Sequence, residues 1–346
     1  MVLREKLPLI VKVVTTLGLM SVVTGCGNTT TTAAADLARS AAKGAEAYVC
    51  NFGYDDQPGT TITAIDLTTR HVGASVPTGS LPSALAATPD GRLLVVADQG
   101  DDNVAVVDTA THKVLVHIPT GVEPDAVAVS PDGKLALVAN VDDNTVTPVN
   151  LTTLRAGRPL AVGTRPDAVA IGGPGGRTAL VADLEGDTIT PVDLDTMTAG
   201  KPIAVGTEPD AVAISPDGRT ALVADFGSGT VTPIDLVTMH AAAPVRVGPG
   251  PTSVAVTTSG PGGAPTAWVT TGVDLVPLNL SSFTVGAPVI VGHLAEAVAV
   301  SGDGSTAWVA GQDATVTPVD LSTGVRGASI YVGGRPAAIV IPAPRH

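Results

Sequence analysis

The ten residues "PDAVAISPDG" at 209–218 occur almost unchanged at two earlier places in the chain. Residues 124–133 are "PDAVAVSPDG" and residues 166–175 are "PDAVAIGGPG". Successive copies are separated by about 42 residues, and periods of roughly 20 to 50 residues are typical of repeat architectures. The fold therefore follows from the content of one unit and from the number of units.

One full unit of the repeat contains four short segments rich in Val, Ala and Thr. In residues 209–250 they are "AVAIS", "TALVAD", "TVTPIDL" and "APVRVG", separated by turn sequences such as "PDG" and "FGSG". Such segments favour strands, and four strands in about 40 residues are typical of a β-propeller blade. A solenoid is the alternative, but its repeats are usually shorter or helical. Full units occupy 82–123, 124–165, 166–208, 209–250, 251–294 and 295–335.

The two ends of the repeat region complement each other. Residues 45–81 contain the last three strand segments of a unit, whereas "AAIVI" at 337–341 is a first strand with nothing after it. Joined, they form a seventh blade and leave no free sheet edge between the first and last units. We predict an all-β fold: a seven-bladed β-propeller of four-stranded blades over residues 45–346, closed by the C-terminal strand joining the N-terminal blade.

The first 25 residues have the pattern of a signal peptide. Arg4 and Lys6 precede an apolar run at 13–23, which is too short to span a bilayer. The run ends in "VTGC" at 23–26, which resembles the bacterial lipobox and implies that Cys26 becomes the acylated N-terminus. Residues 26–44 are small and polar and are predicted to form a flexible tether. A secreted protein with a chance cysteine is the alternative.

The second cysteine, Cys50, has no partner if Cys26 is lipidated, and it is then expected to be a buried strand thiol. A Cys26–Cys50 disulfide would require the lipobox interpretation to be wrong. Acyl chains on Cys26 would hold the protein at the membrane. We therefore expect it on the outer side of the cytoplasmic membrane, in the cell envelope.

The charge and aromatic content limit the partners. The net charge is −13, which argues against a nucleic-acid backbone as a partner. Aromatic residues make up only 2% of the chain, which is too few for a confident carbohydrate site. Trp268 and Trp308 occupy core positions of second strands, while Phe52 and Phe226 lie in hairpins at the predicted upper face. The partners we expect are the membrane, through Cys26, and a protein or cell-wall ligand.

Two pairs of segments resemble the YVTN-type β-propeller repeats. They are "AYVCNFG" at 47–53 with "TITAIDL" at 61–67, and "PDAVAVSPDGKLALVAN" at 124–140 with "TVTPVNL" at 145–151. The resemblance implies an extracytoplasmic seven-bladed propeller, although Cys50 replaces the Thr of the name-giving motif. Lactonases, quinoproteins and lyases share this fold, so the resemblance does not select a chemistry.

Acidic residues gather where the chain enters the inner strand of each blade. Asp125, Asp167, Asp210 and Glu296 occupy this position in four units and predict an acidic mouth of the central channel. Such a mouth is a candidate site for Ca²⁺ or another divalent cation. The alternative is that repeat duplication and turn geometry account for these acids. Further acids occur in the second-to-third hairpins of the same face, at Asp55, Asp56, Asp101, Asp102, Asp142, Asp143, Glu185 and Asp187.

Two other recurring acids are predicted to be structural. The Asp of the "PDG" and "GDG" turns, at 90, 132, 217 and 303, supports a tight turn. The Asp or Asn of "VDL" and its variants precedes a turn and is expected to cap backbone N–H groups there. These residues are Asp66, Asp108, Asn150, Asp193, Asp235, Asn279 and Asp320.

Catalytic motifs are weak. His293 lies three residues before Glu296 at an entry to the channel, and the pair is a weak candidate for acid–base catalysis or half of a metal site. A lone loop histidine is the simpler alternative, and no GxSxG nucleophile motif is present. The sequence favours a binding scaffold. A lactonase-like hydrolase or lyase, metal-dependent or not, with its site at the channel mouth is the alternative.

Overall fold

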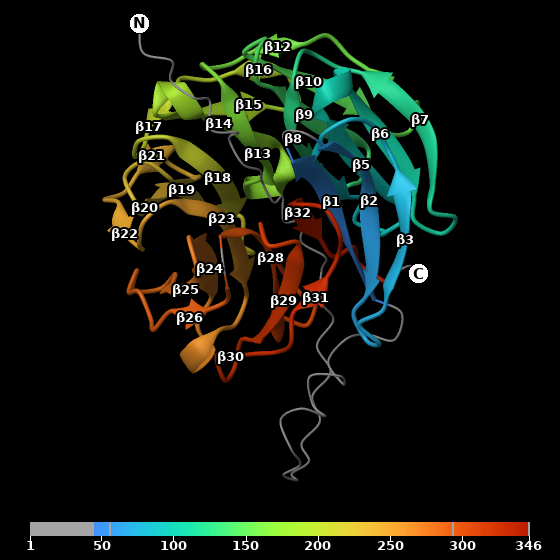
Figure 1. Ribbon diagram of the computed structural model, residues 1–346. Coiled ribbons are helices and arrows are strands. Elements are labelled where there is room, and N and C mark those ends of the chain that lie inside the picture. Colours follow the sequence, from blue (N-terminus) through green and yellow to red (C-terminus); the bar gives the residue numbers. More distant parts are fainter. Residues whose placement is uncertain (1–44, 55–56, 293, 345–346) are drawn as a thin grey trace, which may run out of the picture.

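The computed structural model describes residues 45–54, 57–292 and 294–344, and this part of the chain is almost entirely β-structure. Its strands form seven separate antiparallel sheets arranged in a ring (Figure 1). The predicted seven-bladed β-propeller is therefore confirmed. The predicted signal peptide at 1–25, the tether at 26–44, Cys26, Asp55, Asp56 and His293 lie outside the described residues.

Each blade is a sheet whose strands follow one another outward from the centre in chain order, except that the inner strand of blade 1 comes from the C-terminal end. Blade 1 consists of β32, β1, β2 and β3, and blades 2 to 7 begin at β4, β8, β13, β18, β23 and β27. The inner strands are β4 (Pro82–Ala87), β8 (Pro124–Val129), β13 (Pro166–Gly172), β18 (Pro209–Ile214), β23 (Pro251–Thr257), β27 (Ala295–Val300) and β32 (Pro336–Val340). The second strands are β1 (Glu46–Tyr54), β5 (Leu93–Asp98), β9 (Leu135–Asn140), β14 (Thr178–Asp183), β19 (Thr220–Asp225), β24 (Thr266–Thr271) and β28 (Thr306–Gly311).

The third strands complete the regular part of each blade. They are β2 (Gln57–Asp66), β6 (Asn103–Asp108), β10 (Thr145–Asn150), β15 (Thr188–Asp193), β20 (Thr230–Asp235), β25 (Asp274–Asn279) and β29 (Thr315–Asp320). Four short 3₁₀ turns occur among the described residues: η1 (Gln99–Asp101), η2 (Pro174–Gly176), η3 (Leu184–Gly186) and η4 (Pro261–Gly263). No helix in the described ranges is long and apolar enough to cross a membrane.

The outer strand is less regular than the sequence predicts. It is continuous in blades 1 and 2, as β3 (Val72–Pro77) and β7 (Lys113–Pro119). In the other blades it is reduced to pieces of two residues: β11 (Arg155–Ala156), β12 (Leu160–Ala161), β16 (Thr198–Ala199), β17 (Ile203–Ala204), β21 (His240–Ala241), β22 (Val245–Arg246), β26 (Val289–Ile290), β30 (Val325–Arg326) and β31 (Ile330–Tyr331). Each blade keeps its predicted four-stranded plan, but in these five blades the outer strand is shortened.

A proline in the third strand explains the interruption. Proline has no N–H and cannot donate to the neighbouring strand. Pro148 is the example in blade 3, where the outer chain pairs with β10 on either side of the proline, as β11 and β12. The Gly157 N–H donates to the Pro148 carbonyl oxygen at 2.7 Å. The same position holds Pro191, Pro233, Pro277 and Pro318 in the other interrupted blades, but Ala64 and Val106 in the two blades with continuous outer strands.

The ring closes between the two ends of the described chain. β32 pairs antiparallel with β1, with Tyr48 opposite Val340 and Val49 opposite Ile339 (Figure 1). Cys50 lies in this blade as a fully buried free thiol, and burial raises the pKa of this thiol well above its ordinary value. The predicted closure of the first blade by the C-terminal strand is confirmed.

The lower-face turns behave as predicted. In blade 3 the Ser130 hydroxyl and the Lys134 N–H donate to one oxygen of Asp132, at 2.6 and 3.1 Å. In blade 1 the N–H groups of Thr68 and Thr69 donate to Asp66, at 2.9 and 2.7 Å. These hydrogen bonds hold the pKa of Asp132 and Asp66 below the ordinary value. Both recurring acids of this face are therefore structural, as are the two tryptophans, which are buried in blades 6 and 7.

Candidate functional site at the upper face

The upper face consists of the links into the inner strands and the hairpins between second and third strands. Several links are held by hairpin carboxylates: the Ser80 N–H donates to Asp101 and the Val122 N–H to Asp143, both at 2.8 Å. The Glu123 N–H donates to Asp102 of the preceding blade at 2.9 Å. Several hairpin acids that the sequence marks as a charged surface are thus engaged in holding the links in place.

The four predicted mouth residues all occupy the second position of an inner strand, but they are buried. Asp125, Asp167, Asp210 and Glu296 have exposed fractions between 0 and 3%. Each of the three aspartates takes part in a hydrogen bond or electrostatic contact. Within the described residues no three His, Cys, Asp or Glu side chains lie close enough to hold a metal ion. The divalent-cation prediction thus gains no support, and ligand binding by the four acids stays a prediction.

Glu296 is the mouth residue with the most distinctive surroundings. The Gln312 amide donates to Glu296 Oε1, and the Arg335 guanidinium lies 3.4 Å from the same oxygen. The second oxygen is buried without a hydrogen-bond partner among the described residues. Burial raises the pKa of Glu296 to about 7, against the lowering effect of Gln312 and Arg335. A carboxyl group with this pKa can exchange a proton near neutral pH.

The predicted partner of Glu296, His293, is outside the described residues, so the structure does not bring the pair together or separate it. Arg335, which the sequence analysis did not single out, is the cation found beside Glu296. Arg335 precedes the C-terminal inner strand in "GGRP", whereas Glu296 follows the link of another blade. The contact joins the inner strand of blade 7 to the link into the next blade, 39 residues later, and no local motif indicated it.

A second set of buried polar residues lies at or near the upper ends of the second strands, and it was not predicted from the sequence. Its members are Asn51, Asp98, Asn140, Asp183 and Asp225. In blade 4, Asp183 accepts hydrogen bonds from Gly163 N–H at 3.1 Å, Thr188 at 2.9 Å and Thr190 at 2.6 Å. We call this arrangement of one link glycine and two threonines, spaced two residues apart on the third strand, the cradle.

The cradle recurs in blades 3 and 5. Asp225 accepts from Gly206 N–H, Thr230 and Thr232 at 3.1, 2.8 and 2.6 Å. Asn140 accepts from Gly121 N–H at 3.1 Å and donates to Thr145 and Thr147 at 3.0 and 2.9 Å. The glycine is required because a Cβ at Gly163 would lie 2.3 Å from the Asp183 carboxyl carbon. The recurrence of "VAD" and "VAN" was the available signal for these residues.

Blade 2 has the acid without its cradle. Asp98 is fully buried, but Asn103 and Ala105 replace the two threonines, and neither carboxylate oxygen accepts a hydrogen bond of good geometry. Burial raises the pKa of Asp98 to about 7; the Thr78 hydroxyl lowers the pKa and the Asp101 charge raises it further. His117 Nδ1 lies 4.0 Å from Asp98 Oδ2. Asp98 is thus a buried acid without adequate solvation.

Comparisons with known proteins agree with the fold and cover the site only in part. A family model described as "Lactonase, 7-bladed beta-propeller" matches residues 46–155. No curated protein matches the chain. Hydrazine synthase of Kuenenia stuttgartiensis is similar in structure, with a TM-score of 0.66, 22% identity, and coverage of 75% of this chain and 89% of that one.

A second solved structure is similar over more of the chain. It is a functionally unknown protein from Desulfotomaculum acetoxidans DSM 771, with a TM-score of 0.73 and 15% identity. The match covers 86% of this chain and 99% of that chain. At these identities the two likenesses show the propeller fold alone.

Proposed function

We propose that the protein is a lipid-anchored β-propeller that binds another protein of the cell envelope through its upper face. The anchoring part of the proposal rests on the apolar run at 13–23 and the "VTGC" sequence ending at Cys26. The resemblance to extracytoplasmic YVTN-type propellers supports the same location, on the outer side of the cytoplasmic membrane. Acyl chains on Cys26 would hold the ring at the bilayer surface.

The observation that carries the binding proposal is a set of exposed apolar side chains on the upper hairpins and links of blades 5 to 7. Phe226, Val273, Ile290 and Leu294 are exposed by 45, 43, 67 and 52%, and we call them the upper apolar patch. The last three belong to adjoining segments, because the Val291 N–H donates to the Val273 carbonyl at 2.9 Å and Ile290 pairs with Asp274. Exposed apolar groups gathered in one region mark interaction surfaces.

The chemistry of this patch favours a protein over a polysaccharide. Two exposed aromatic side chains lie on this part of the upper face, Phe226 and Tyr331, and Tyr331 has the position in blade 7 that Ile290 has in blade 6. The other exposed apolar side chains of the patch are aliphatic. Aliphatic side chains bury well against the apolar side chains of a partner protein. Sugars are bound mainly by stacking on several aromatic rings, and the whole chain has only eight residues of Phe, Trp and Tyr.

Replacement of the patch by small polar residues tests the proposal. We expect Phe226→Ser/Val273→Ser/Leu294→Ser to weaken binding to the envelope partner at least about tenfold, because central apolar contacts carry most of the binding energy of an interface. The partner is identified by cross-linking in envelope fractions, purified and titrated calorimetrically against the full chain.

The matched control lies on the lower face. Val237, Phe283 and Val325 are exposed by 67, 36 and 54%, so Val237→Ser/Phe283→Ser/Val325→Ser removes a comparable apolar surface. We expect this control to bind within about twofold of the unmodified chain, within the usual range for residues outside an interface. Equal loss in the two triple variants, or no loss in either, would contradict binding through the upper face.

Glu296 favours a second candidate function, a lactonase-like hydrolase. Its carboxyl group is buried at the channel mouth beside Arg335, and its pKa is raised to about 7. In this candidate mechanism Glu296 acts as general base on an attacking water, and Arg335 stabilises the negative charge that develops on the carbonyl oxygen of the ester. The family-model match over residues 46–155 supports the same class of reaction.

Replacing Glu296 tests the hydrolase candidate. With a panel of γ- and δ-lactones, we expect Glu296→Gln to lower kcat/KM by about 10² to 10⁴, the range for loss of a general base. The unmodified chain should gain activity as pH rises through about 7, where Glu296 loses its proton. Glu208→Gln, at an exposed link of the same face, is the control and should retain full activity. Turnover that is equal in both variants and the unmodified chain would exclude this role for Glu296.

A further inference from the structure

Blade 7 has the threonines of the cradle but not the side chain that the cradle holds elsewhere. Gly311 ends the second strand and pairs with Thr315, as Asp183 pairs with Thr188 and Asn140 with Thr145. Thr315 and Thr317 occupy the positions of Thr188 and Thr190. The chain thus places two cradle hydroxyls around a position with no side chain.

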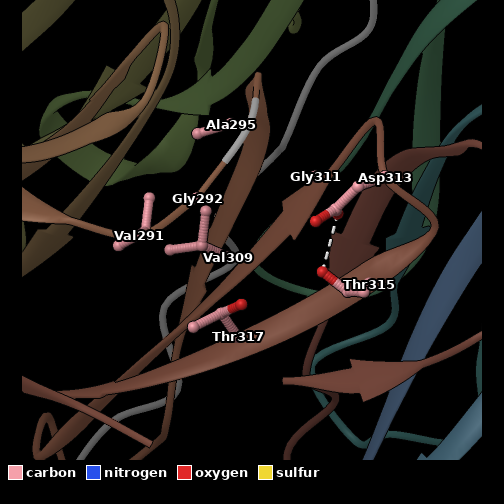
Figure 2. A pocket seen from close by; sticks show the side chains of 8 residues that line it. All are labelled: Val291, Gly292, Ala295, Val309, Gly311, Asp313, Thr315 and Thr317. Carbon is pink, nitrogen blue, oxygen red and sulfur yellow. Dashed lines mark hydrogen bonds between the residues drawn. The ribbon is translucent and has the colours of Figure 1, made fainter. Parts of the chain in front are cut away.

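A pocket lies at this position (Figure 2). It opens to solvent, and the enclosed space is small, with a volume of about 10 Å³. Its lining includes Gly311, Thr315 and Thr317 from the blade and Gly292 from the link. Gly292 corresponds to the cradle glycines, but among the described residues no heavy atom lies within 4 Å of a Cβ built on it, whereas a Cβ at Gly163 would meet the carboxyl carbon of Asp183. The pocket is therefore the space that Asp or Asn fills in the other blades.

The hydrogen bonds of the two threonines decide which chemistry fits the pocket. Thr315 donates its only hydroxyl proton to Asp313, at 2.7 Å, and so presents lone pairs to the pocket. Thr317 is paired with Ser329, with the two hydroxyl oxygens 2.8 Å apart. An acceptor such as a carboxylate would compete with Asp313 for the Thr315 proton, whereas an N–H donor would not.

Blade 1 contains the same side chains with their occupant present. Its Asn51 carboxamide donates to Thr61 and Thr63 at 2.9 and 2.8 Å, and Thr63 is paired with Ser75 at 3.0 Å. Thr61, Thr63 and Ser75 correspond to Thr315, Thr317 and Ser329 of blade 7. Blade 1 thus has the same three hydroxyl residues as the empty cradle of blade 7, and in blade 1 they surround the amide group of Asn51.

We infer that this pocket is a binding site for a primary carboxamide. The amide NH₂ group donates to Thr315 and Thr317, as Asn51 donates to its two threonines. The amide oxygen faces Gly292, whose N–H makes only a long bond of 3.4 Å to the Val273 carbonyl. The negative charge of Asp313 beside the pocket disfavours an anion and leaves a neutral amide unaffected. This inference is independent of the proposed partner binding.

Two sources carry this chemistry, a free small amide and an Asn or Gln side chain of a peptide. The first probe is acetamide, titrated into the isotope-labelled full chain and followed by NMR chemical shifts. A dissociation constant of about 10 mM is expected for so small a ligand. Acetate should bind at least about tenfold more weakly. N-acetyl-asparagine methylamide, which carries the same group on a peptide unit, should bind more tightly than acetamide if the source is a peptide and no more tightly if it is a small amide.

Variants in the pocket identify the site. Gly311→Asn should fill the cradle with its own carboxamide, abolish saturable acetamide binding and raise Tm by about 2 °C. Thr315→Val/Thr317→Val removes the hydroxyl acceptors with little change in shape and should weaken acetamide binding at least tenfold. Gly302→Asn, on an exposed turn of the lower face, is the matched control and should bind like the unmodified chain.

Two results would overturn the inference. One is acetate binding as tightly as acetamide, which would mean that the pocket accepts any small polar group. The other is acetamide binding that is absent in the unmodified chain or unchanged in Gly311→Asn. Absence would leave water as the occupant of the pocket, and persistence in the filled variant would place acetamide elsewhere.

Discussion

Truncation of the chain after Arg335 is expected to abolish cooperative folding of the ring. The change removes β32, whose Ala337, Ala338, Ile339 and Val340 are buried. Full burial of each large aliphatic side chain contributes about 1.5 to 3 kcal/mol, and blade 1 would also lose an entire strand pairing. The combined loss is comparable with a typical net stability of about 5 to 15 kcal/mol. Urea denaturation followed by circular dichroism measures it.

Removal of residues 345–346 alone is the control for the truncation, because these two residues follow the inner strand. We expect this shorter truncation to unfold at the same urea concentration as the full chain. A synthetic peptide of residues 336–346, added in excess to the long truncation, should restore part of the cooperative transition. An unaltered urea midpoint after loss of β32 would mean that closure between the chain ends contributes nothing to stability.

Asp98→Asn is expected to stabilise the protein at neutral and alkaline pH. The pKa of Asp98 is raised to about 7 in the folded state from an ordinary value of 3.8, so the folded state binds the proton more tightly than the unfolded state. The stability associated with protonated Asp98 is fully present below about pH 4 and is lost as pH rises to about 7. A pKa shift of this size corresponds to a loss of as much as about 4 kcal/mol in the free energy of unfolding when Asp98 ionises. The amide of Asp98→Asn does not ionise, so the variant avoids this loss at every pH.

Urea midpoints measured between pH 4 and pH 8.5 test this expectation. The difference between Asp98→Asn and the unmodified chain should be small at pH 4 and should grow to its maximum above pH 7. Asp183→Asn is the comparison variant: burial also raises the pKa of Asp183, but hydrogen bonds from Thr190, Thr188 and Gly163 oppose the rise, so its pH-dependent gain should be smaller. This carboxylate is already held by three hydrogen bonds, and Asn140 shows that an amide occupies an equivalent cradle. A stability difference for Asp98→Asn that does not change with pH would contradict the assignment of Asp98 as a poorly solvated acid.

The fold was predictable because its determinants are local and repeated. Each "PDAVA" segment begins an inner strand, and each "VDL" Asp caps the turn that follows it, so one unit indicates the others. Closure was also predictable, since 337–341 supplies the single strand that residues 45–81 lack. The broken outer strands were missed although their cause is visible, because the third-strand proline acts on a neighbouring strand rather than on its own.

The upper-face sites depend on contacts that sequence spacing does not express. The position of Asp125, Asp167 and Asp210 at the channel strands was predicted, but their burial was not, because burial is set by how neighbouring blades pack. The contact between Arg335 and Glu296 joins residues 39 positions apart, at opposite ends of one repeat unit. The pocket at Gly311 is recognised only by comparison with Asp183 and Asn51, whose hydrogen bonds show which side chain is missing.

The measurement that tests the account most directly is site-specific photo-cross-linking in intact cells that express the full chain. A photoreactive residue is placed at Phe226 on the upper face or at Val237 on the lower face, with exposed fractions of 45 and 67%. We expect a discrete cross-linked envelope protein from position 226, none from position 237, and loss of the cross-link when Cys26→Ser releases the chain from the membrane. Cross-linking to the same protein from both faces, or only from position 237, would contradict binding through the upper face.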